Sequence, residues 1–128
     1  MLSRRSSLVA LCVWLALAQG CRNEPVSDLT LAHEVSPNPP RVGPVTITLR
    51  LTDTAGRQVD GARITLEANM SHAGMVPVFA DARETEPGRY QSTMELSMAG
   101  DWFILVHVTL KDGRKIDRQF DIKGVVAA

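Results

Sequence analysis

The 128-residue sequence has no excess of charge of either sign. Its 14 lysines and arginines balance 14 aspartates and glutamates, so the formal net charge at pH 7 is zero. A nucleic-acid-binding domain usually carries a concentrated positive charge. The balance therefore argues against nucleic acid as a partner, and the length is that of one domain.

The sequence also lacks an apolar run long enough to cross a membrane. Residues 8–18 read LVALCVWLALA, and a helix of this length spans roughly 16 Å against a hydrocarbon core of about 30 Å. The run follows Arg4 and Arg5 and precedes Ala18 and Gly20, which is the pattern of an export signal. We therefore predict a signal peptide over residues 1–20.

Cysteine is scarce, with two residues in the whole chain. Cys12 lies inside the predicted signal peptide. The segment from Leu17 to Cys21 resembles a bacterial lipoprotein signal, in which the cysteine is diacylated and becomes the mature N-terminus. The folded domain is then expected to contain no disulfide and no cysteine-based zinc or iron–sulfur site.

The lipoprotein resemblance implies that Cys21 carries a lipid anchor and that residues 21–27 form a polar tether. Several acyl chains hold a domain durably on a membrane, here on the extracytoplasmic, periplasmic side. Ordinary secretion as a soluble periplasmic protein is the alternative.

From residue 28 onward, no stretch keeps a helical period for long. Apolar and polar residues alternate between turn signals, which predicts strands with one buried face. The predicted strands are Leu29–Val35, Val45–Thr52, Ala62–Asn69, Val78–Glu84, Tyr90–Leu96, Trp102–Leu110 and Lys115–Ile122. Seven strands in about 95 residues are typical of an immunoglobulin-like β-sandwich, which we place over residues 28–123, with residues 124–128 as a tail. Lys111, Asp112 and Gly113 are expected to supply the positive-φ residues of a hairpin turn.

Antiparallel strands would bring alternate connections to the same end of such a sandwich. Three connections should therefore meet at one end: the loop after Val35, the segment Asn69–Pro77 and the segment Ser97–Gly100. The turns at Gly56, Pro87 and Gly113 should lie at the other.

The segment Asn69–Pro77 contains two thioethers and an imidazole within six residues, and Met98 is expected at the same end. Thioether and imidazole suit soft metal ions, and methionine favours Cu(I) over zinc because its sulfur is polarizable and uncharged. The candidate copper ligands are thus Met70, His72, Met75 and Met98, and His33 could approach them.

Each candidate also has a purely structural interpretation. Met70 continues the inward alternation of its strand and could fill the core, His72 could be an ordinary loop residue, and Met75 and Met98 could cap the open end. We expect Met94 to be a core residue and His107 a partnered structural histidine. No nucleophile–base pair or carboxylate pair is placed for catalysis, so an enzyme is not expected.

Four phrases give the chain a family resemblance. They are DTAGRQVDG at Asp53–Gly61, the segment Ala62–Pro77, PGRY at Pro87–Tyr90 and MAGDW at Met98–Trp102. In this order and spacing they resemble the YtkA-like domain family, related to FixH-type proteins, over about residues 28–122. The resemblance implies an extracytoplasmic immunoglobulin-like sandwich without enzymatic activity. It also implies copper handling, because FixH-type members are associated with copper oxidase assembly and the wider family with heavy-metal transport.

Two functions follow from these observations. The first is a membrane-anchored module that binds or delivers copper, with a metal-transport or oxidase-assembly protein as partner. The second is an interaction domain that docks onto a membrane protein complex, with its methionines forming an apolar contact patch.

Overall fold

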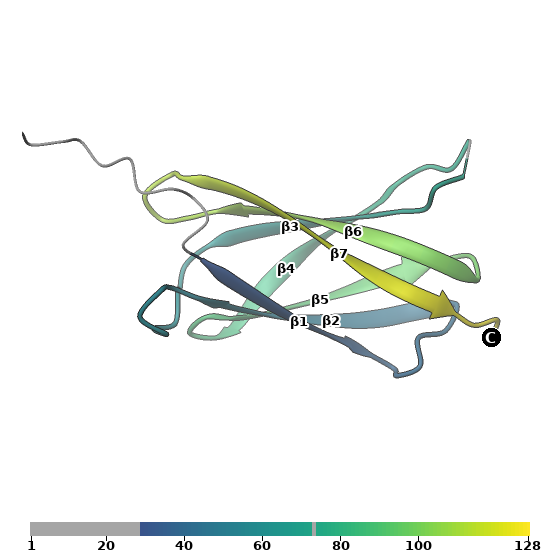
Figure 1. The fold of residues 1–128 in the computed structure, drawn as a ribbon, viewed down its shortest axis with the longest axis horizontal. Helices are drawn as coiled ribbons and strands as arrows, with labels where there is room; N and C mark the ends of the chain where they lie inside the picture. Colours follow the sequence, from purple (N-terminus) through teal and green to yellow (C-terminus); the bar gives the residue numbers. More distant parts are fainter. Residues whose placement is uncertain (1–28, 73) are drawn as a thin grey trace, which may run out of the picture.

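The computed structural model describes residues 29–72 and 74–128, which fold into seven β-strands (Figure 1). The predicted signal peptide, Cys21 and the tether lie outside the described residues. The strands are β1 (Thr30–Ser36), β2 (Gly43–Thr52), β3 (Arg63–Asn69), β4 (Val78–Glu86), β5 (Arg89–Leu96), β6 (Gly100–Thr109) and β7 (Lys115–Val125). They confirm all seven predicted strands, and β7 runs three residues further than predicted.

Alternation along the strands separates core from surface as predicted. In β2, the side chains of Val45, Ile47, Leu49 and Leu51 are buried, and β6 buries every second residue from Trp102 to Val108. Burial of each such side chain stabilises the folded state by about 1.5–3 kcal/mol. All buried core residues of the described chain lie between Val45 and Val125, so this stretch carries the core that the structure describes.

Strand pairing is antiparallel throughout, in the order β1-β2-β5-β4-β3-β6-β7. Strand β4 belongs to both halves, because Val78–Ala82 pair with β3 whereas Arg83–Glu86 pair with β5. The sheet thus folds over itself into two layers, with β1, β2 and β5 facing β3, β6 and β7 (Figure 1). This confirms the predicted immunoglobulin-like sandwich and places β6 between β3 and β7.

The outer strands of the two layers meet along one side of the sandwich. The His33 ring on β1 stacks on the Phe120 ring of β7, with 4.0 Å between centroids and 14° between planes. Near the C-terminus, Val126 accepts a hydrogen bond from the Val42 N–H at 2.8 Å and donates one to the Pro40 carbonyl at 3.0 Å. Polar and aromatic contacts therefore close this side.

The three connections that were expected to meet do lie at one end, at the right of Figure 1. We call this the loop end and define it by residues 37–42, 70–77 and 97–99. The opposite end carries the tighter turns. There the buried Tyr90 hydroxyl donates to the Val59 carbonyl at 2.9 Å and accepts from the Ala62 N–H at 3.0 Å. Burial raises the Tyr90 pKa to about 12, so the hydroxyl keeps the proton that it donates.

The β6–β7 turn corrects one expectation. The Gly113 N–H donates to the Leu110 carbonyl at 2.9 Å, and the Leu110 N–H donates to the Arg114 carbonyl at 2.8 Å. This is a three-residue hairpin loop, which needs a left-handed residue only at its last position. Gly113 has a φ of +89°, whereas Lys111 and Asp112 keep negative φ.

Candidate functional site

Met70 lies at the loop end directly after β3, with its side chain turned into the core. It is 7% exposed and belongs to the hydrophobic cluster. Its methyl carbon lies 3.1 Å from the place where a Cβ on Gly100 would stand. Gly100 thus leaves room for this side chain, and its φ of +124° suits glycine. This burial favours the interpretation of Met70 as a core residue.

His72 and Met75 lie on one tight turn of the β3–β4 loop. The Met75 N–H donates to the His72 carbonyl at 3.5 Å, and Gly74 between them has a φ of +83°. The reversal expected near Gly74 is present, while Ala73 lies outside the described residues. The His72 side chain is exposed, and Met75 is half-buried against the core. The turn therefore presents the imidazole to solvent and keeps the thioether close to the protein.

Met98 lies on the β5–β6 turn and is 47% exposed. Its backbone carbonyl accepts a hydrogen bond from the indole N–H of the buried Trp102 at 2.9 Å. The tryptophan therefore fixes the backbone of the turn while the thioether faces solvent. Met70 contacts this same turn at Gly100, so the two methionine-bearing loops touch.

The remaining histidines and Met94 are engaged elsewhere. The His33 ring is stacked on Phe120, midway along β1. Met94 is buried in the core, as expected. His107 contacts the Asp117 carboxylate through Nδ1 at 2.8 Å and the Glu67 carboxylate through Nε2 at 3.4 Å. These contacts, Asp117 first, raise the His107 pKa above its ordinary value, which confirms a partnered structural histidine.

The donor set at the loop end consists of three thioethers and one imidazole. Such donors fit a soft ion such as Cu(I), because none carries a charge or has to lose a proton when the imidazole is neutral. Within residues 29–72 and 74–128, no group of three or more His, Cys, Asp or Glu is arranged to hold a metal ion. The same ranges contain no helix with the length and hydropathy needed to cross a bilayer.

Exposed apolar side chains lie in and beside the loop end. Four large hydrophobic side chains are strongly exposed: Val76 at 79%, Phe79 at 63%, Met98 at 47% and Val126 at 44%. Val76 and Met98 lie in loops of this end, Phe79 lies at the start of β4, and Val126 follows β7. The sequence indicated Met98 alone. Phe79 could have been found from its outward position in the alternation of its strand.

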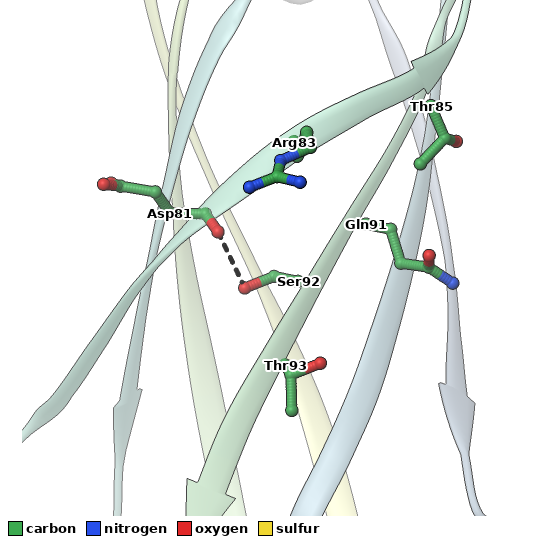
Figure 2. A pocket seen from close by; sticks show the side chains of 6 residues that line it. All are labelled: Asp81, Arg83, Thr85, Gln91, Ser92 and Thr93. Carbon is green, nitrogen blue, oxygen red and sulfur yellow. Dashed lines mark hydrogen bonds between the residues drawn. The ribbon is translucent and has the colours of Figure 1, made fainter.

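A pocket of about 350 Å³ lies where β4 leaves β3 for β5, and sequence reasoning did not find it. Figure 2 shows its lining side chains, Asp81, Arg83, Thr85, Gln91, Ser92 and Thr93. The buried Ser92 hydroxyl donates to the Asp81 backbone carbonyl at 3.0 Å, while the Asp81 carboxylate points away from it. The two strands therefore separate at a polar junction.

The layered antiparallel strands and the loop end define a small immunoglobulin-like β-sandwich domain. The chain belongs to the YtkA-like family, whose model matches residues 24–107. This confirms the family resemblance of the sequence. Comparison with curated protein sequences gives no significant match.

Solved structures share the fold at low sequence identity. A DUF4785 family protein of Legionella pneumophila superposes with a TM-score of 0.52 at 13% identity, over 78% of this chain and 29% of the Legionella protein. The chain thus spans less than a third of that protein. The PmoD soluble domain from Methylocystis sp. gives a TM-score of 0.47 at 14% identity, over 77% and 90% of the two chains. MtrC from Shewanella baltica gives 0.45 at 13% identity, over 75% and 22%.

Proposed function

We propose that this protein is an extracytoplasmic, membrane-anchored module that binds or delivers a soft metal ion, copper in particular, at its loop end. The observation that supports the proposal is that Met70, His72, Met75 and Met98 all lie on two touching loops at one end of the sandwich. The role is one of binding rather than catalysis. The lipid on Cys21 holds the sandwich at the membrane, where a metal-transport or oxidase-assembly protein is the partner.

Exposure assigns different roles to the four candidates. His72 and Met98 are accessible to an ion that arrives from solvent, and Met75 lies on the same turn as His72. These three form the accessible part of the donor set. Met70 packs between the two loops, because its methyl group fills the space beside Gly100. Thioethers have no proton to lose on binding Cu(I), so binding should persist at mildly acidic pH.

Copper binding is tested with residues 22–128, which omit the leader and Cys21 and keep every described strand. The protein is titrated with Cu(I) under reducing conditions against a chromophoric chelator. The test variant is His72→Ala/Met75→Leu/Met98→Leu, and Met94→Leu is the matched control because Met94 is a buried core methionine. Met94 qualifies as the control because it is 1% exposed and so is not accessible to an ion from solvent. We expect one equivalent of Cu(I) in the parent protein and in the control, and at least tenfold weaker binding in the triple variant. Equal retention by all three proteins would refute the proposal.

A second function is docking onto a membrane protein complex without metal. It is favoured by the four exposed hydrophobic side chains at and beside the loop end, because exposed apolar surface is a feature of interaction sites. Cross-linking from membranes with and without copper separates the two functions. A partner that is retained without copper and after Met75→Leu and Met98→Leu supports docking, whereas a partner that needs both copper and the methionines supports metal transfer.

A further inference from the structure

The side of the sandwich between β4 and β5 is open toward the loop end. The two strands pair only near their turn, through Arg83–Glu86 of β4, and they diverge beyond it (Figure 1). In the described chain, Val78–Ala82 pair only with β3, and Ser92–Leu96 pair only with β2. Each of these half-strands therefore has one edge without a neighbouring strand.

The backbone groups on the free edge of β4 can be identified from the contact at the pocket. Ser92 of β5 donates to the Asp81 carbonyl, so this carbonyl points toward β5 and away from β3. In an antiparallel ladder, the N–H and C=O of one residue point to the same side, and the side alternates along the strand. The Asp81 N–H and both backbone groups of Phe79 therefore also point to the free edge. These three groups can pair with an incoming strand.

The side chains along this edge are less covered than their counterparts on β3. Val78, Ala80 and Ala82 face the core but are only half-buried, whereas Ile64, Leu66 and Ala68 of β3 are almost fully buried. On the outer face, Phe79 is 63% exposed. Natural edge strands are usually protected by lysine, proline or a bulge. Here Pro77 stands just before the strand, and Asp81 is the single charge within Val78–Ala82.

The charge at this edge selects the chemistry of the partner. Asp81 lies on the same outer face as Phe79 and Glu67, and Phe79 is paired with Glu67 on β3. Asp81 accepts a hydrogen bond from the Thr65 hydroxyl at 3.2 Å, and it has no ion-pair partner among the residues that the structure describes. A strand laid along β4 would thus meet an aromatic ring followed, two residues on, by an unpaired carboxylate.

We propose that Val78–Ala82 of β4 accept an extended segment of a partner protein, in which apolar residues alternate with lysine or arginine. The segment adds a strand to the sheet through the backbone groups of Phe79 and Asp81. The apolar residues of the segment lie on the core side and cover the half-buried Val78, Ala80 and Ala82. Its basic residues lie on the outer face, where one pairs with Asp81 and the alkyl chain of another covers Phe79. The proposal needs no metal and is tested in metal-free buffer, so it stands or fails independently of copper binding.

The probe is a nine-residue peptide of alternating valine and lysine with blocked ends. It is titrated into isotope-labelled residues 22–128, and the backbone amide signals are followed by NMR. We expect saturable shifts concentrated at Val78–Ala82. A valine–glutamate peptide should bind at least tenfold more weakly, and a valine–lysine peptide N-methylated at every residue should not bind, because neither of its edges can donate to β4.

Asp81→Lys tests the charge, with Asp121→Lys on β7 as the matched control for net charge. The first variant should weaken binding of the basic peptide at least tenfold and the second should not, and Trp102 fluorescence checks that both variants are folded. Absence of binding, shifts centred on β1 or β7, or undiminished binding of the methylated peptide would overturn the proposal. Self-association that protects the same amides without peptide, seen by sedimentation, would assign the edge to a second copy of the chain and would also overturn it.

Discussion

Substitution of Met70 separates a packing role from a ligand role at the loop end. Met70 is 7% exposed and fills the space beside Gly100, whereas Met98 is 47% exposed on the neighbouring turn. Truncation of a buried methionine leaves a cavity, so Met70→Ala should lower the free energy of unfolding by about 2–4 kcal/mol. Met98→Ala removes a side chain that is largely in solvent and should change it by less than about 0.5 kcal/mol. Met70→Leu keeps the volume and should cost less than about 1.5 kcal/mol.

The assay is equilibrium unfolding of residues 22–128 in urea, followed by the fluorescence of Trp102. Trp102 is the only tryptophan in this part of the chain and is buried, so its emission reports on the core beside the loop end. A total stability of about 5–15 kcal/mol makes the expected loss easy to resolve. If Met70→Ala were as mild as Met98→Ala, Met70 would not be a core residue, and the packing of the two loops derived from Gly100 would be wrong.

Three further changes have defined outcomes. Tyr90→Phe leaves a backbone carbonyl and a backbone N–H without their shared hydroxyl and should destabilise the fold by about 1–3 kcal/mol in the same unfolding assay; an unchanged midpoint would contradict this. His107 has a raised pKa in the fold, mainly through Asp117, so its contribution to stability is fully present below the unfolded pKa of about 6.5 and is lost as pH rises through the folded pKa. The difference in unfolding free energy between the parent and His107→Gln should therefore shrink above pH 6.5. A difference that stays constant with pH would mean that the histidine contacts carry no charge and would contradict this prediction. Cys21→Ser should move the full chain from the membrane fraction to the soluble fraction, and a wild-type protein that is already soluble would refute the lipid anchor.

Strand positions could be predicted from the sequence because alternation with a period of two directly reports one buried face. Val45 to Leu51 and Trp102 to Val108 show this pattern without interruption, and both strands are found where the pattern put them. The pairing of β4 could not be predicted in the same way. Alternation indicates which face of a strand is buried but not which strand lies beside it. The sequence therefore does not indicate that β4 changes its pairing partner after Ala82.

The meeting of the methionine loops at one end could also be predicted, because it follows from antiparallel order alone. The exposure of each side chain could not. Met70 and Met98 have the same chemistry, and their different burial depends on the space that Gly100 leaves between two loops distant in sequence. The outward position of Phe79 follows from alternation, whereas the free edge of β4 beside it is a property of the tertiary fold.

The central claim, that the loop end binds copper, is tested most directly by NMR of methyl-labelled methionine in residues 22–128 during titration with Cu(I). The methyl signals of Met75 and Met98 should shift and saturate together at one equivalent, with a change at the His72 ring. The Met94 signal should move least, because Met94 is 1% exposed in the core and cannot reach the ion. Methyl signals at the loop end that do not move through the titration, or that move no more than the Met94 signal, would contradict the account.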